Sequence, residues 1–265
     1  MRLHLRLLFF LCLLHAIASG QPGMNYQQIA VDYLRKGRAI DALEYLNLAI
    51  RKDPEVPELY YLRGYAKYSL DDYLGAEQDY SRSIDLSPYL SDVFTNRAIV
   101  RSQVQNYKGA MEDFDHSIEM DPNNAETYYH RARTNLLQKK HYSCIVDCNK
   151  AIALKYENEY LYILRASAEL EIKRFNEAIV DLDQAKKINP KNGYIHSQRG
   201  LVWTEMNEVD SAIADFSRAV ELDSTNTFAI FNRALCLVKK NDQVAALKDL
   251  NTVIRISPYN SYAYY

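Results

Sequence analysis

The sequence predicts an all-α fold, a solenoid of seven antiparallel helix pairs. Three columns of residues, each returning every 34 positions along the 265-residue chain, carry this prediction. The first column is proline or its replacement, at Pro54, Pro88, Pro122, Tyr156, Pro190, Ser224 and Pro258. The second column lies 12 residues before the first and is alanine except at Cys144. The third column lies another 12 residues earlier and is always glycine or alanine. Such a period is typical of solenoids, in which each repeat buries its apolar face only against its neighbours.

The first 20 residues lie outside this period and have the pattern of a secretory signal peptide. The start is basic (Arg2 and Arg6), residues 7–14 are apolar, and small residues follow at Ala16 and Ala18. The apolar run is shorter than the roughly 20 residues that span a bilayer, so we expect this segment to be removed, leaving no membrane span. A retained anchor is the alternative. The expected location is the periplasm, the cell envelope or the secreted fraction.

Residues 21–265 are expected to form one array of repeats. The proline column sets their limits at 23–56, 57–90, 91–124, 125–158, 159–192, 193–226 and 227–260, with residues 261–265 beginning an eighth. Solenoids normally close with a helix whose outer face is polar. Either the array is therefore part of a longer one, or its C-terminal end pairs with another molecule, which includes self-association.

Each repeat is expected to contain two helices, as residues 125–158 illustrate. Asn124 can cap the first helix, because its side chain can accept a hydrogen bond from a free backbone N–H. Apolar residues then recur at helical spacing at Tyr128, Ala132 and Leu136, and a second apolar stripe follows from Cys144. The proline column ends the second helix.

A polar pattern accompanies the apolar one in six repeats. An arginine on each first helix precedes an aspartate on the second helix by 16 residues. Across an antiparallel hairpin these positions can face one another, so we expect a ladder of partly buried ion pairs that fixes the register of each hairpin. The pairs are Arg63–Asp79, Arg97–Asp113, Arg131–Asp147, Arg165–Asp181, Arg199–Asp215 and Arg233–Asp249.

Cysteine content and charge limit the chemistry. Three cysteines follow the signal segment, an odd number that argues against a disulfide framework. Cys144 and Cys148 occupy core columns and are interpreted as small buried hydrophobes. His141 could join them in a soft-metal site, but a fourth ligand is missing, so no metal or cofactor is predicted. Without Arg2 and Arg6, 32 basic against 34 acidic side chains become 30 against 34, a net charge of −4, which gives no basic face for nucleic acid.

These columns resemble the tetratricopeptide repeat (TPR). The resemblance covers residues 23–260 and is most typical in the segments 110–114 (AMEDF) and 212–216 (AIADF). Tyr156 and Ser224 depart from the proline column and Cys144 from the alanine column. The resemblance implies a right-handed superhelix whose first helices line a concave groove.

Carrying the groove columns of the family over to this chain gives the candidate binding residues. The chaperone-binding members hold a C-terminal carboxylate with Lys, Asn and Arg in these columns, whereas this chain has tyrosines and aliphatics, so that ligand is not expected. The Tyr61, Tyr65 and Tyr68 stripe has two interpretations, packing between repeats or capture of a peptide. The candidates in the groove or at its edge are Tyr61, Tyr65, Tyr68, Ile99, Tyr129, Arg133, Leu136, Tyr160, Tyr194 and Phe228.

The predicted function is a non-catalytic scaffold that binds a peptide or helix of a partner protein. The sequence contains no phosphate loop, no His-Glu-x-x-His motif and no nucleophile elbow, so no enzyme is predicted. A glycan-binding groove with tyrosines as platforms for sugar rings is the alternative. RNA binding by helical-hairpin repeats is disfavoured by the acidic balance and the signal segment.

Overall fold

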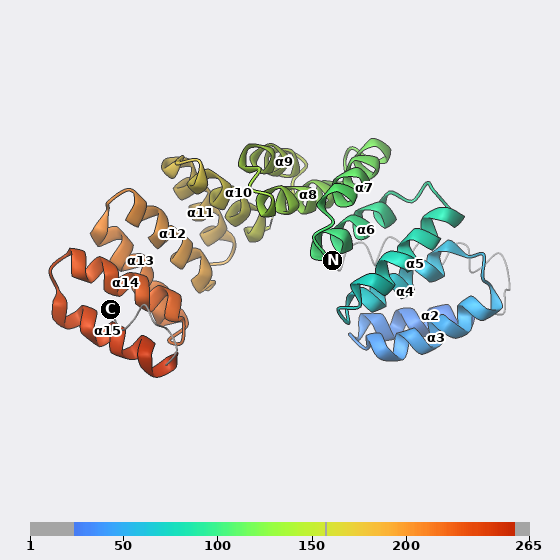
Figure 1. The fold of residues 1–265 in the computed structure, drawn as a ribbon, viewed down its shortest axis with the longest axis horizontal. Helices are drawn as coiled ribbons and strands as arrows, with labels where there is room; N and C mark the ends of the chain where they lie inside the picture. Colours follow the sequence, from blue (N-terminus) through green and yellow to red (C-terminus); the bar gives the residue numbers. More distant parts are fainter. Residues whose placement is uncertain (1–23, 157, 258–265) are drawn as a thin grey trace. The chain divides into compact units, whose positions relative to one another are not determined.

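The computed structural model describes residues 24–156 and 158–257. The expected signal peptide and the start of an eighth repeat lie outside these residues. The described residues form fourteen α-helices and no strand (Figure 1). The helices are α2 (Met24–Arg35), α3 (Ala39–Lys52), α4 (Pro57–Tyr68), α5 (Tyr73–Leu86), α6 (Ser91–Gln103), α7 (Tyr107–Met120), α8 (Ala125–Leu137), α9 (His141–Ala153), α10 (Glu159–Glu171), α11 (Phe175–Ile188), α12 (Gly193–Glu205), α13 (Val209–Leu222), α14 (Thr227–Lys239) and α15 (Gln243–Ile256).

The chain divides into two compact units, one ending at Thr127 and the other beginning at Tyr128. In the first unit α2 packs on α3, α4 on α5 and α6 on α7, and successive pairs meet where α3 contacts α4 and α5 contacts α6. In the second unit α10 packs on α11, α12 on α13 and α14 on α15, and the pairs stack in the same way. Each unit is thus a stack of helix hairpins, which confirms the predicted all-α solenoid.

The turn inside each hairpin has the same backbone geometry. The residue two or three positions after each first helix has a positive φ between 58° and 73°. The N–H that follows it bonds back to a carbonyl five residues earlier, as Asp72 does to Lys67 at 3.0 Å, which closes the helix end. Only one of the seven positions is glycine, so the others hold a conformation that L-residues disfavour. The seven residues with positive φ are Gly37, Asp71, Gln105, Lys139, Lys173, Asn207 and Asn241.

The columns of small residues lie where the two helices of a hairpin meet. Ala98 and Ala110, one from each column, are both fully buried. A methyl group added at Gly64 would lie 2.8 Å from the ring of Tyr80. At Gly200 the same group would lie 2.7 Å from the ring of Phe216. These columns are small because an aromatic ring of the second helix fills the space beside them.

The predicted arginine–aspartate ladder is confirmed in all six hairpins. Nε and Nη2 of each arginine donate to the two oxygens of its aspartate at 2.5–3.0 Å. The aspartates are buried, while the arginines keep 15–21% of their side-chain surface exposed. Paired, bidentate geometry is what makes burial of a carboxylate tolerable.

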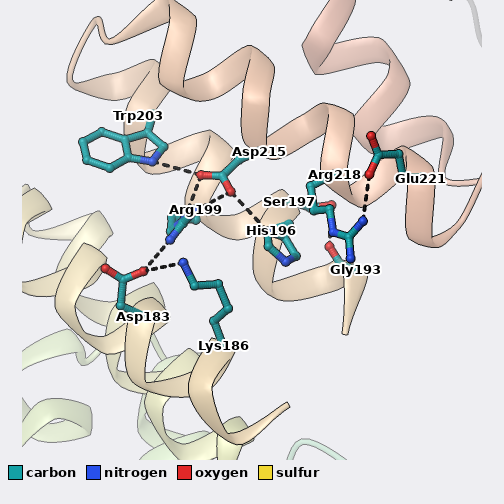
Figure 2. Close-up of polar contacts among 10 residues, drawn as sticks. All are labelled: Asp183, Lys186, Gly193, His196, Ser197, Arg199, Trp203, Asp215, Arg218 and Glu221. Atoms are coloured by element: carbon teal, nitrogen blue, oxygen red, sulfur yellow. Dashed lines mark hydrogen bonds and ion pairs between the residues drawn. The ribbon is translucent and has the colours of Figure 1, made fainter. Parts of the chain in front are cut away.

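The arginines also connect neighbouring hairpins, which the sequence analysis did not foresee. Nη1 of five of them reaches back 16 residues to a polar side chain on the preceding second helix. Figure 2 shows one example, in which Arg199 bonds both Asp215 of its own hairpin and Asp183 of α11. The five acceptors are Asn47, Ser81, Asn149, Asp183 and Ser217.

Asp215 receives the largest number of partners in Figure 2. Besides Arg199, Nε1 of Trp203 donates to it at 3.0 Å and Nδ1 of His196 lies 3.1 Å away. Burial raises the pKa of the Asp215 carboxyl, but the hydrogen bonds from His196 and Arg199 outweigh it, so that the pKa lies below its ordinary value. Every one of these groups is directed at another protein group, which is the arrangement of a structural network.

Candidate partner-binding surface

Tyr61 belongs to the core of the first unit. Its side chain is 6% exposed, and its ring centroid lies 5.9 Å from that of Tyr80. Nδ2 of Asn96 donates to its hydroxyl at 3.3 Å. Burial raises the pKa of this hydroxyl well above its ordinary value. For this residue the packing interpretation of the tyrosine stripe holds.

The other groove candidates of the first unit are partly buried. Tyr65 and Tyr68 pack against the same core cluster as Tyr61, and the Tyr68 ring lies 6.0 Å from the ring of Tyr73. Ile99 packs against a second cluster that contains Phe114. Each of these side chains offers a partner only the part of its surface that packing leaves exposed.

The candidates in the second unit divide into two groups. Tyr129 is partly buried, with the ring of Tyr156 at 5.5 Å between centroids. Arg133 and Leu136 are likewise partly exposed. Tyr160 and Tyr194, by contrast, are exposed.

Tyr160, Tyr194 and Phe228 form what we call the aromatic column. They are 54%, 52% and 46% exposed and occupy the same position in the first turns of α10, α12 and α14. Contacts join α10 to α12 and α12 to α14, so these turns follow one another along the stack. Rings of this kind, half exposed on a rigid scaffold, are common anchors for a protein partner.

Asparagine caps hold the aromatic column in register. Oδ1 of Asn158 accepts from the N–H of Tyr160 at 2.8 Å, and Oδ1 of Asn192 accepts from the N–H of Tyr194 at 3.0 Å. Oδ1 of Asn226 caps α14 through the N–H of Ala229. Since each helix starts at an equivalent asparagine, the three rings leave their helices at equivalent points.

The aromatic column is confined to the second unit. The same position is acidic in the second, third and fourth repeats, with Glu58, Asp92 and Glu126, and is Met24 in the first. The spacing of 34 residues was therefore sufficient to find the column, but the sequence could not distinguish its exposed rings from the buried Tyr61.

A second exposed apolar group lies on second helices and was missed by the sequence analysis. Tyr142 and Val146 of α9 and Val180 of α11 are 66%, 65% and 59% exposed. Val146 and Val180 are 34 residues apart, which is the signal that could have revealed them. Their position on second helices places them outside the expected groove.

The cysteines of the described residues are buried core groups. Cys144 and Cys148 are fully buried, as expected for core residues. A hydrogen bond with Cys144 and burial raise the pKa of the Cys148 thiol far above its ordinary value, which keeps it protonated. Within residues 24–156 and 158–257 no three His, Cys, Asp or Glu side chains are grouped to hold a metal ion, and no helix is long and apolar enough to cross a membrane.

Comparison with known families agrees with this architecture. Two family models, each described as a tetratricopeptide repeat, match residues 28–91 and 160–192. These segments include α4 of the first unit and α10, whose first turn carries Tyr160. The chain contains tetratricopeptide repeats. No curated protein matches the sequence of this TPR protein.

Solved TPR structures share the fold at low sequence identity. A TPR protein from Parabacteroides merdae is 17% identical, with a TM-score of 0.68, over 91% of this chain and 94% of that one. The C-terminal part of a TPR protein from Cytophaga hutchinsonii is 14% identical, with a TM-score of 0.70, over 89% and 97%. YrrB, described as a TPR protein with an unusual peptide-binding site, is 20% identical, with a TM-score of 0.60, over 70% and 95%.

Proposed function

We propose that this TPR protein is a non-catalytic scaffold that binds an extended peptide or short helix of a partner protein along the aromatic column. The exposure of Tyr160, Tyr194 and Phe228 at equivalent points of the first helices of three successive hairpins carries the proposal. Binding a partner over the three half-exposed rings would bury apolar surface, and each Å² buried contributes about 25 cal/mol of favourable free energy. The phenol hydroxyls of the two tyrosines add directional hydrogen bonds.

One property of the structure and one comparison support a peptide as the ligand. The helices that carry the column are tied to their neighbours by arginines, for example Arg165 to Asp181 and Asn149, and Arg199 to Asp183 and Asp215. These hydrogen bonds fix the helices that carry the rings. Binding a partner therefore costs little conformational entropy in this part of the protein. YrrB is described as having a peptide-binding site on the same fold, which is consistent with the proposal.

A peptide library displayed on phage and selected on the protein without residues 1–20 tests this function. We expect selected peptides to bind the protein, measured by fluorescence anisotropy, and to lose at least tenfold in affinity when Tyr160, Tyr194 and Phe228 are all changed to serine. The control changes Tyr89 and Tyr142, which are 87% and 66% exposed, to serine and should bind as the parent does.

Other outcomes separate the alternatives. Equal binding by parent and triple variant would place the site elsewhere and contradict the proposal. Sugar oligomers that raise the melting temperature, when no peptide binds, would support the glycan-binding alternative. Circular dichroism of each variant shows whether it keeps the helical fold.

We also propose that residues 1–20 direct export, which places the scaffold in the periplasm, the cell envelope or the secretory space. The basic start, the short apolar run and the small residues at Ala16 and Ala18 support this. Intact mass of the protein recovered from its cells tests it: a chain shortened at its N-terminus is expected, and a full-length chain in the cytoplasm would refute it.

A further inference from the structure

The turns of two successive hairpins are basic. Lys139 and Lys140 join α8 to α9, and Lys173 and Arg174 join α10 to α11. All four side chains are exposed. We call residues 139–140 and 173–174 the basic turns, because the other described hairpins do not have a cation at both positions. Those hairpins hold Gly37 and Arg38, Asp71 and Asp72, Gln105 and Asn106, Asn207 and Glu208, and Asn241 and Asp242.

Cations do not favour the local structure of these turns. Lys139 and Lys173 have a φ of 58° and 62°, a conformation that L-residues disfavour. Lys140 and Arg174 precede α9 and α11 at the positive end of the helix dipole, and neither caps its helix with a side-chain hydrogen bond. Residues that break the local preferences of a fold are expected at functional sites. The equivalent residues that do accept such a capping bond are Asp72, Asn106 and Asp242.

The basic turns adjoin the exposed apolar side chains of α9 and α11. Cζ of Arg174 lies 5.8 Å from the centre of the Tyr142 ring. Tyr142 and Val146 are four residues apart on one face of α9, and Val180 holds the position of Val146 in α11. Exposed apolar side chains and basic turns therefore coincide in the same two hairpins. In the other described hairpins the position of Val146 is occupied by Glu44, Gln78, Glu112, Ala214 and Lys248.

We infer that the basic turns, together with Tyr142, Val146 and Val180, bind an acidic, amphipathic segment of a partner protein. The apolar side chains of that segment cover Tyr142, Val146 and Val180, and its carboxylates pair with the basic turns. Opposite charges steer such a partner to the surface and exclude basic ones. In an antiparallel hairpin the turn lies at the end opposite to the start of the first helix, so this site is separate from the aromatic column.

The mixture of charges favours a protein segment over an anionic membrane. Glu171 and Glu177, on either side of the second basic turn, are exposed. An anionic bilayer has one sign of charge over its whole surface and would meet these carboxylates as well as the cations. A protein segment can place its carboxylates opposite the cations alone.

The probe is a synthetic helical peptide with leucine and phenylalanine on one face and glutamates on both flanks of that face. Its binding to the protein without residues 1–20 is followed by fluorescence anisotropy. We expect Lys140→Glu with Arg174→Glu to weaken binding about tenfold, because attraction becomes repulsion. A second probe, with lysine in place of each glutamate, should bind this variant and not the parent. A carboxylate is favourable at a helix N-terminus, so the variant should keep its fold, which circular dichroism checks.

Matched variants locate the surface. Lys239→Glu with Lys248→Glu, the same change of charge on exposed residues of the last described hairpin, should bind the acidic probe as the parent does. Val146→Ser with Val180→Ser should weaken binding about tenfold. The variant with serine at all three positions of the aromatic column should bind the probe unchanged, so this inference and the proposed function can fail separately.

Three outcomes would overturn the inference. The first is no binding of the acidic probe, or equal binding by the parent and the variant Lys140→Glu with Arg174→Glu. The second is binding of the parent to phosphatidylglycerol vesicles without binding of the probe, which would assign the surface to a membrane. The third is a dimer of the protein alone, measured by sedimentation and lost in that variant, which would assign the surface to a second copy.

Discussion

Glu169 in the α10–α11 hairpin is expected to make the stability of this TPR protein depend on pH near neutrality. It stands four residues after Arg165, and its side chain is 6% exposed. Most other repeats place a donor at this position and bond it to the aspartate of the ladder, as Asn135 bonds Asp147 at 2.9 Å. Glu169 can donate only when it is protonated, and its Oε2 is buried without a hydrogen-bond partner.

The charges around Glu169 set the direction of the effect. Burial raises its pKa from the ordinary 4.5 to about 7, and the carboxylates of Asp181 and Glu177 on α11 act in the same direction, while Arg165 on its own helix opposes them. Below this pKa the protonated Glu169 donates to Asp181. Above it, two carboxylates meet in a buried hairpin, which is unfavourable.

The sign and size follow from linkage. A group whose pKa is higher in the folded protein stabilises it fully below the unfolded pKa and loses that contribution as pH rises through the folded value. The window here runs from about pH 4.5 to about pH 7. One pKa unit corresponds to about 1.4 kcal/mol, so this residue lowers the free energy of unfolding by about 3 kcal/mol across the window.

Glu169→Gln is the perturbation that tests this, because the amide donates to Asp181 at every pH. We expect the variant to match the parent near pH 4.5 and to exceed it by about 3 kcal/mol at pH 8. Urea unfolding followed by circular dichroism from pH 4.5 to 8.5 measures the difference. Hydrogen exchange of α10 and α11 amides localises it. Glu171→Gln, at an exposed residue of the same helix, is the control. Parallel pH profiles for Glu169→Gln and the parent would refute the reasoning.

Three further predictions concern the features that build each hairpin. Arg131→Asp or Asp147→Arg alone should destabilise by about 3 kcal/mol, because each leaves a buried charge unpaired, and the double reversal should recover part of this in urea unfolding; no recovery would contradict the pairing. Gly200→Ala should cost about 1 kcal/mol net, since crowding against Phe216 outweighs the gain in helix propensity, and adding Phe216→Leu should restore the melting temperature. Lys173→Gly should raise the free energy of unfolding by about 1 kcal/mol, because Lys173 has a φ of 62°; an unchanged or lower melting temperature would show that the turn tolerates lysine without strain.

The candidate binding residues show how far the family resemblance leads. It placed Tyr61 and Tyr160 together as groove candidates, and both lie on first helices. Packing separates them, since Tyr61 lies against Tyr80 and Asn96 whereas Tyr160 remains 54% exposed. The exposure of a ring depends on which neighbouring side chains are large enough to cover it. The spacing of residues along one helix does not predict this.

The sequence by itself determined the repeat and the pairs within each hairpin. A period of 34 residues fixed two helices per repeat, and the 16-residue spacing of Arg63 and Asp79 placed them opposite one another, because a short turn leaves an antiparallel pair little freedom. Only the tertiary structure showed that Arg63 also reaches Asn47 in the preceding hairpin, and that Glu169 lies against Asp181. Those contacts depend on how successive hairpins stack and on which side chains meet in the buried space, which is settled by packing in three dimensions.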